Sequence, residues 1–104
     1  MSKRTRKKAD NRLKEILDAA VDIAAAEGLR GTTRELIAAR CDISPALVSM
    51  HYGTMGQLRR AVMRAAVERR VLSIVAEGLA TRDPQALKAP DDLREAAAAS
   101  LTRG

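Results

Sequence analysis

The fold is decided by residues 31–54, GTTRELIAARCDISPALVSMHYGT. Two helix start signals occur in this stretch. Thr33 can cap a helix that runs to about residue 41, and its apolar face is expected from Leu36, Ile37, Ala38 and Cys41. Ser44 followed by Pro45 is typical of an N-cap and a first helical residue, because the fixed φ of proline suits that position. The stretch therefore predicts two short helices, the second over about 45–51, joined by a tight turn.

Further helices are predicted on both sides. Apolar residues at helical spacing predict a helix over 11–27, and they are Leu13, Ile16, Leu17, Ala20, Ile23 and Ala24. Gly53 can end the second short helix, and Thr54 can cap one long helix from Met55 to about Ala80. After the breaks at Pro84 and Pro90, a last helix is expected from Asp91 to about Leu101. The sequence thus predicts an all-α fold. It comprises a three-helix, homeodomain-like helix-turn-helix domain, a long fourth helix and a short C-terminal helix.

Positive charge is concentrated at the N-terminus. The chain has 104 residues, which predicts one domain, and a formal net charge of +6. Residues 1–14 contain seven basic residues and one acidic residue, so they carry the whole net charge. Residues 1–9 are therefore interpreted as a basic arm for a polyanion, with Lys3, Arg4, Arg6, Lys7 and Lys8 as its cations. The alternative is a disordered tail that only improves solubility.

Other classes of protein are disfavoured by composition. The single cysteine, Cys41, cannot form an intramolecular disulfide, and we expect a buried packing residue in a cytoplasmic protein with no membrane span. A single aromatic residue, Tyr52, gives no stacking platform for single-stranded nucleic acid, so duplex DNA is favoured. One histidine and no glycine-rich phosphate loop argue against an enzyme, and no metal or other cofactor is expected.

A helix-turn-helix places its second helix in the major groove of DNA. The residues that make this layout specific are Ile16 to Val21, Glu27-Gly28, Gly31-Thr32-Thr33, Ile37-Ala38, Ile43-Ser44, Val48, His51-Tyr52 and Leu58. This pattern resembles the DNA-binding domain of TetR-family transcriptional regulators over about residues 10–70. The resemblance implies a sequence-specific, double-stranded-DNA-binding repressor. The alternatives are a protein-interaction adaptor and a non-specific DNA-binding protein from a mobile element.

The resemblance also implies roles for individual residues. Thr33 and His51 match positions that meet the phosphate backbone, although His51 could equally be a partly buried histidine at a helix end. Val48 and Tyr52 match inward positions of the recognition helix, and its exposed face is formed by Ser44, Pro45, Ala46, Leu47, Ser49 and Met50. Arg34 is the best candidate for a charged contact near the groove, and it would be equally ordinary as a surface residue.

The chain departs from the family pattern at several positions. Ser49 stands where a phosphate-binding tyrosine is usual, Met55 replaces a lysine, Asp42 replaces a glycine of the turn, and Ala24 replaces a large aromatic residue. The recognition face then has few hydrogen-bond donors. Apolar contact with thymine methyl groups and readout of DNA shape are therefore expected, with Leu47 and Met50 exposed.

Residues 71–104 are interpreted as a short helical segment in place of the larger domain that binds an inducer in TetR-like repressors. A small-molecule inducer is therefore not expected. The fourth helix and the alanine-rich segment 93–101 are candidates for a homodimer interface, and the alternative is that both complete the core of a monomer.

Overall fold

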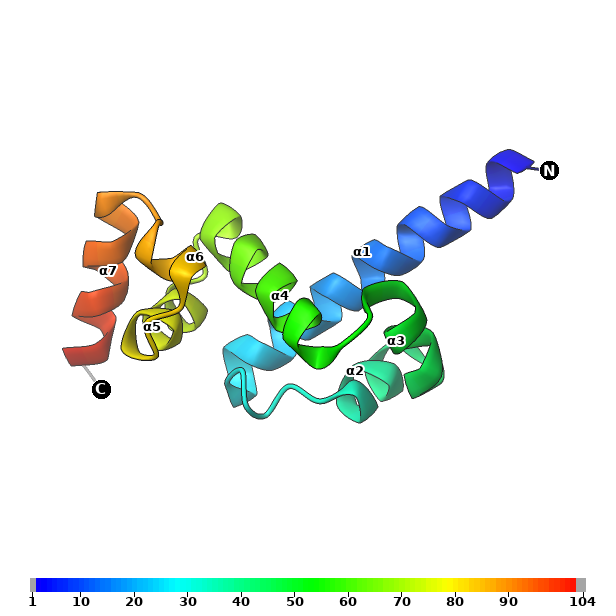
Figure 1. The fold of residues 1–104 in the computed structure, drawn as a ribbon, viewed down its shortest axis with the longest axis horizontal. Coiled ribbons are helices and arrows are strands. Elements are labelled where there is room, and N and C mark those ends of the chain that lie inside the picture. The colour runs from blue at the N-terminus through cyan, green and yellow to red at the C-terminus, as the bar shows by residue number, and fades with distance from the viewer. Residues whose placement is uncertain (1, 103–104) are drawn as a thin grey trace.

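Helices make up the described structure (Figure 1). A computed structural model describes the backbone of residues 2–102 and the side chains of residues 11–101. The elements, in chain order, are α1 (Ser2–Glu27), α2 (Arg34–Cys41), α3 (Pro45–Tyr52), α4 (Met55–Arg69), α5 (Leu72–Ala80), α6 (Pro84–Leu87) and α7 (Asp91–Thr102). No strand occurs between residues 2 and 102, which confirms the all-α class. The molecule measures 49 × 25 × 19 Å, and the N-terminal end of α1 projects from one end of it.

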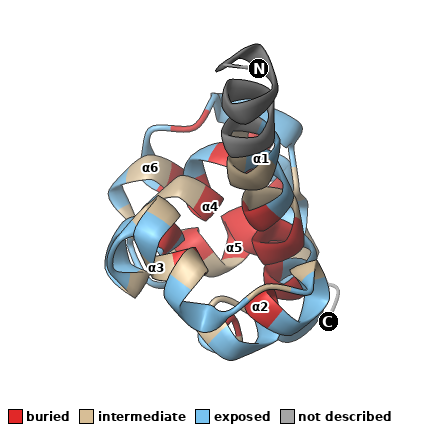
Figure 2. Ribbon diagram, turned by 90° about the vertical axis from the view of Figure 1, so that its right-hand side faces the viewer, coloured by how far each residue is buried: buried red, intermediate tan, exposed pale blue. Residues whose placement is uncertain are grey.

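The helix-turn-helix part is held by one aliphatic core. Ile16 of α1, Ile37 of α2, Val48 of α3 and Leu58 of α4 are each at most 1% exposed. In Figure 2 the buried segments of these helices face one another across the interior. Each such side chain stabilises the fold by about 1.5–3 kcal/mol relative to an exposed position. The core therefore fixes α3 by its inner side alone and leaves its outer side free.

Side chains cap three of the helices as predicted. Thr33 accepts a hydrogen bond from Leu36 N at 3.2 Å, and Ser44 accepts one from Leu47 N at 3.3 Å. Thr54 and Gln57 form a capping box at the start of α4. The expectation that Leu36 belongs to the buried apolar face of α2 was wrong, because this side chain is 47% exposed. Because Ile37 and Ala38 already fill the inner side of α2, Leu36 is turned toward solvent.

The predicted long fourth helix was wrong, because it is broken at Arg70. This residue adopts a left-handed conformation with φ 57° and ψ 47°, and Val71 N then bonds back to Ala66 O at 2.9 Å. Neither glycine nor proline lies near, so the sequence carries no stop signal. The Arg70 guanidinium bonds Asp92 of α7 at 2.6 Å, which links this turn to the last helix. A tertiary contact thus accompanies a break that local propensity does not predict.

The other predicted ends differ less. Helix α1 begins at Ser2 and not at residue 11, because lysine, arginine and alanine in the arm favour helix and no glycine or proline precedes Gly28. The short α6 was not predicted, and Asp83 caps it by accepting a hydrogen bond from Gln85 N at 2.9 Å. The last helix begins at Asp91 as predicted.

Helices α5, α6 and α7 pack together at the end of the molecule opposite the arm (Figure 1). Their core contains Ile74, Ala86 and Leu93, all 0% exposed. Glu77 of α5 joins this end to the helix-turn-helix part, since its carboxylate accepts hydrogen bonds from Leu29 N at 2.9 and 3.1 Å. Leu29 lies two residues after the end of α1, so the loop that leads into α2 is anchored from α5.

Candidate nucleic-acid interface

The turn between α2 and α3 is built on Asp42. This residue has φ 56° and ψ 47°, a left-handed conformation that glycine and, less often, aspartate adopt. Ile43 N then donates to Ala38 O at 3.0 Å, which ends α2. Asp42 therefore occupies the turn conformation for which the family pattern has glycine, and the departure leaves the helix-turn-helix geometry intact.

The outer side of α3 is the exposed surface next to this turn. Met50 is 73% exposed, and Ser44, Pro45 and Ala46 are exposed as well, as predicted. Val48 is 1% exposed on the inner side. Tyr52 is half-buried, and its hydroxyl donates to Leu13 O at 3.0 Å, which attaches the end of α3 to α1.

Two positions of α3 are less exposed than predicted. Leu47, expected to be exposed, is half-buried, and so is Ser49. Both lie about 100° around the helix from Val48, whereas Met50 lies about 200° away. Flanking positions at this angle are partly covered by neighbouring residues. The prediction of an exposed side chain was therefore right for Met50 and wrong for Leu47.

Arg34 reaches α3 from the first turn of α2. Its Nη1 donates to Ser49 Oγ at 2.9 Å. A guanidinium is thus held beside the recognition face, where the sequence alone suggested few hydrogen-bond donors. Each residue was singled out in the sequence, but their pairing was not, because the two positions are separated by the turn. Ser49 still has its hydroxyl proton, and Arg34 still has further N–H groups to donate.

Thr33 caps the start of α2, and His51 lies in the last turn of α3. The Thr33 hydroxyl oxygen is occupied by the cap of α2, which leaves its O–H to donate. His51 is half-buried in the last turn of α3, consistent with the partly buried alternative, and it borders a surface hollow against α4. Lys3, Arg4, Arg6, Lys7 and Lys8 belong to α1, but their side chains lie outside the described residues.

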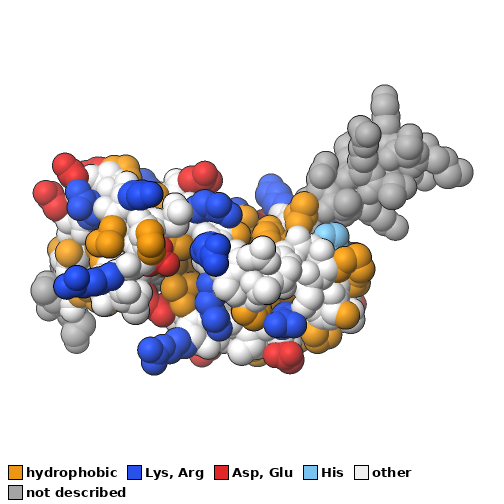
Figure 3. All heavy atoms as spheres, viewed as in Figure 1, with side chains coloured by type: hydrophobic (Ala, Val, Ile, Leu, Met, Phe, Trp, Pro, Cys, Tyr) orange, Lys and Arg blue, Asp and Glu red, His pale blue; other side chains and the backbone are white. Residues whose placement is uncertain are grey.

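Further cations lie on α4, and sequence reasoning missed them. Arg60 and Arg64 are both exposed. Figure 3 shows Lys and Arg side chains gathered over the middle of the face in view, where α4 crosses in front of α1. The spacing of Arg60 and Arg64 was a usable signal, because residues four apart share one helix face.

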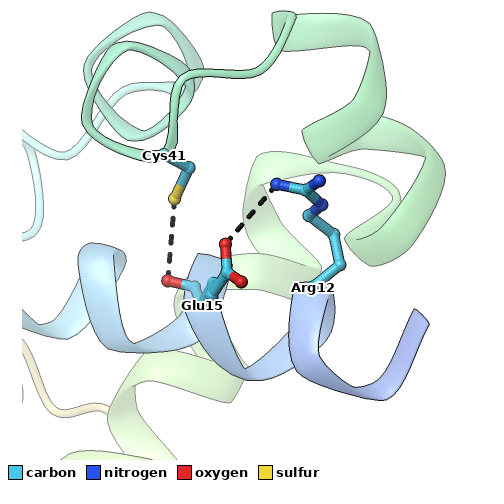
Figure 4. Close-up of polar contacts among 3 residues, drawn as sticks. All are labelled: Arg12, Glu15 and Cys41. Atoms are coloured by element: carbon cyan, nitrogen blue, oxygen red, sulfur yellow. Dashed lines mark hydrogen bonds and ion pairs between the residues drawn. The ribbon is translucent and has the colours of Figure 1, made fainter. Parts of the chain in front are cut away.

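Cys41 is the last residue of α2, and it contacts α1 (Figure 4). Its Sγ donates to Glu15 O at 3.6 Å, and the Glu15 carboxylate lies 3.4 Å from Arg12 Nη1. The expected full burial was wrong, since Cys41 is half-buried. Partial burial of the thiol and, as the smaller cause, the negative charge of Glu15 raise the pKa of the Cys41 thiol above its ordinary value of 9.0. The thiol therefore has little nucleophilic character at neutral pH.

Among residues 11–101, no group of three or more His, Cys, Asp or Glu side chains could hold a metal ion. Within the described part, no helix is long and apolar enough to cross a membrane.

Comparison with known families identifies this part of the chain. Residues 16–62 match the family model of bacterial regulatory proteins, tetR family. The match runs from the core residue Ile16 of α1 to Val62 of α4, so it covers the helix-turn-helix and the helices that hold it. Searches of curated proteins and of solved structures gave no match. Regulators of this family bind DNA and usually act as dimers. The chain therefore carries a helix-turn-helix DNA-binding domain of the TetR family of transcriptional regulators.

Proposed function

We propose that the chain is a sequence-specific repressor that binds double-stranded DNA with α3 in the major groove. The observation that carries the proposal is the division of α3 into two sides. Val48 is 1% exposed toward the core, while Met50 is 73% exposed on the opposite side. A helix held by one side only, beside a left-handed turn at Asp42, can enter a groove without unfolding any part of the core.

The side chains on this surface suggest how bases are read. Ala46 and Met50 offer apolar contacts to thymine methyl groups, and the Arg34 guanidinium held by Ser49 offers donors to a base edge or a phosphate. Thr33 and His51 are assigned to backbone phosphates. The cations of residues 1–9 add affinity that does not depend on sequence.

The test is selection of duplexes from a random library, followed by binding to the selected duplex and to a shuffled duplex at physiological ionic strength. We expect the selected duplex to bind at least about 10³-fold more tightly. Equal binding to both would show a non-specific DNA-binding protein. No binding even at low salt would support the adaptor.

A matched pair of variants separates base contact from folding. Met50→Ala removes an exposed side chain of α3, and we expect a loss of about 1–3 kcal/mol at one base pair with little effect on stability. Leu36→Ala removes an equally apolar side chain of α2, at 47% exposure, which borders a hollow against α1 and not the outer side of α3, and it should leave binding unchanged. Equal effects of the two changes would contradict the placement of the recognition face.

Repression is tested by transcription from a template in which the selected site overlaps the promoter. We expect fewer transcripts as the protein is added, and an increase would instead show an activator. The hollows found on the described surface open to solvent, and we assign no inducer to them.

A homodimer is part of the proposal, and of the two segments expected for its interface only the C-terminal one is kept. The apolar face of α4 is buried inside the chain, with Leu58, Val62 and Met63 at most 1% exposed, so α4 completes the monomer core. The large apolar side chains that stay exposed on α5–α7 are Leu72, Leu87 and Leu101. We assign the dimer contact to this end. Sedimentation tests the assignment by comparing the oligomeric state of the wild type, expected to be a dimer, with that of Leu101→Lys, expected to be a monomer.

A further inference from the structure

A cationic hollow lies where α3 meets α4. Its volume is about 310 Å³, and it is lined by His51 and Tyr52 of α3 and by Gln57, Arg60, Ala61 and Arg64 of α4. Arg60 and Arg64 are one helical turn apart, so both arise from the same face of α4. Two guanidinium groups and one imidazole therefore border a single open space.

The charges of this hollow are not neutralised within the described chain. Five arginines between residues 11 and 101 form ion pairs, namely Arg12, Arg40, Arg69, Arg70 and Arg94. Over the same residues, neither Arg60 nor Arg64 lies within ion-pair distance of a carboxylate, and no acidic side chain lines the hollow. The nearest acidic residue along α4 is Glu68, which borders an adjoining hollow with Arg64. Like charges four residues apart repel each other, so an anion between them would stabilise this arrangement.

Hydrogen-bond donors are also available there. The Gln57 side-chain oxygen accepts from Thr54 N at 2.9 Å, which fixes the amide and leaves its NH₂ group free to donate. His51 can donate from an imidazole nitrogen. Planar guanidinium groups combined with N–H donors match the geometry of phosphate oxygens.

The position of the hollow indicates the source of the phosphate. His51 and Tyr52 are the last two residues of α3, so the hollow adjoins the end of the recognition helix. Tyr52 bonds Leu13 O of α1, and the adjoining hollow reaches Leu17, so the space lies beside the helix that carries the basic arm. A ligand here would lie between two segments that the proposed function directs toward DNA.

We propose that this hollow binds a phosphate group of the DNA backbone, with Arg60 and Arg64 as its principal ligands and His51 and Gln57 as hydrogen-bond donors. The inference rests on the proposed function. It extends the DNA-binding surface from α3 along α4. Because the contact is to phosphate, it adds affinity equally for all duplex sequences.

The experiment measures how duplex binding depends on salt. Arg60→Gln and Arg64→Gln should each lower the slope of log K against log salt by about 1, with the preference for the selected duplex unchanged. Arg59→Gln is the matched control, because Arg59 is an exposed neighbour on α4 that does not line the hollow. It should keep the wild-type slope. Circular dichroism checks that all three variants are folded.

A second measurement identifies the source of the phosphate. His51 is the single histidine, so its imidazole gives one resolved set of NMR signals. We expect these signals to shift when duplex is added and to shift less in Arg60→Gln. Pyrophosphate alone should produce only a weak, salt-sensitive shift. Tight pyrophosphate binding that needs Arg60 and Arg64, with no change in the duplex slope, would overturn the assignment in favour of a free phosphate compound.

Failure of the inference differs from failure of the proposed function. If the wild type binds the selected duplex and all three variants keep its salt slope, the phosphate assignment is wrong and the proposed function stands. If the wild type binds no duplex at low salt, the proposed function is wrong, and the backbone assignment is overturned with it.

Discussion

Gly78 lies where α5 packs tightly against Met63 of α4 and Ala86 of α6, and a methyl group added there should destabilise the fold. A Cβ at Gly78 would lie 2.6 Å from Met63 Cε and 2.7 Å from Ala86 Cβ. The Met63 methyl can rotate away, because it is the end of a flexible side chain. The Ala86 methyl cannot, since it is attached directly to the backbone of α6. The change Gly78→Ala therefore forces α6 to shift relative to α5.

Two effects oppose each other in this variant. Overpacking of a well-filled core typically costs about 1–3 kcal/mol. Replacing glycine by alanine inside a helix returns about 0.8–1.0 kcal/mol of propensity. The expected net result is a loss of about 1 kcal/mol, which corresponds to a fall in Tm of about 4–8 °C for a domain of this size.

Gly56 provides the matched control, because it is also helical but faces open space. A Cβ there would meet only Thr54 Oγ1, at 3.7 Å. Gly56→Ala should therefore stabilise the fold by about 0.5–1 kcal/mol. Both variants gain propensity, so the difference between their free energies of unfolding measures mainly the steric cost at Gly78.

The free energy of unfolding is measured in urea for the wild type and both variants, with circular dichroism as the signal. A second test adds Ala86→Gly, in whose background Gly78→Ala should cost less, with a coupling energy of at least about 0.5 kcal/mol. The reasoning is refuted if Gly78→Ala is as stable as Gly56→Ala, or if the Ala86→Gly background leaves its cost unchanged.

Three further predictions concern polar contacts. Ser49→Ala frees the Arg34 guanidinium, and we expect a loss of about 0.5–1.5 kcal/mol in binding to the selected duplex; Arg34→Ala should then cost less in the Ser49→Ala background, and additive losses would contradict the pairing. Because the pKa of the Cys41 thiol is raised, alkylation at pH 8 should be slower in the folded chain than in urea, and equal rates would show that partial burial does not protect it. The Arg70 hydrogen bond lowers the pKa of Asp92, so this contact stabilises the fold above the ordinary pKa of 3.8 and is lost as pH falls through the lowered value. Asp92→Asn should therefore reduce stability at pH 7 and flatten its acid dependence, and an unchanged acid transition would count against the contact.

Local chemistry decided most of what could be predicted about the helix-turn-helix. Capping side chains and a proline fix where α2 and α3 begin, because they satisfy backbone groups within three residues of themselves. The inward position of Val48 followed from the resemblance to the TetR family, and the helical spacing of Val48 and Tyr52 agrees with it. The break at Arg70 could not be predicted in this way. There a non-glycine residue in a left-handed conformation is held partly by Asp92, which lies 22 residues further along the chain.

The candidate site shows the same division between local and tertiary information. Its exposed residues on α3 were predictable from one helix, and Met50 was placed correctly. The hydrogen bond from Arg34 to Ser49 and the hollow shared by His51, Arg60 and Arg64 each join two helices. Helical periodicity describes one helix at a time, so it could identify the members of these groups but not bring them together.

Acidic and basic residues have different uses in this chain, and the difference bears on function. Acidic side chains are largely used to hold the structure together. Asp18 and Asp22 pair with arginines of other helices, Asp92 pairs with Arg70 at the break after α4, and Glu77 anchors the loop after α1. The basic residues have two locations that matter for binding. One is the arm, and the other is α4, whose arginines at positions 60 and 64 form no ion pair within residues 11–101. Since residues 15–104 are neutral in total, this internal use of acids leaves unpaired positive charge on the helices next to α3. A chain with little net charge outside its arm can therefore still present a phosphate-binding surface, and the arm and the α4 hollow should contribute separately to the salt dependence of DNA binding.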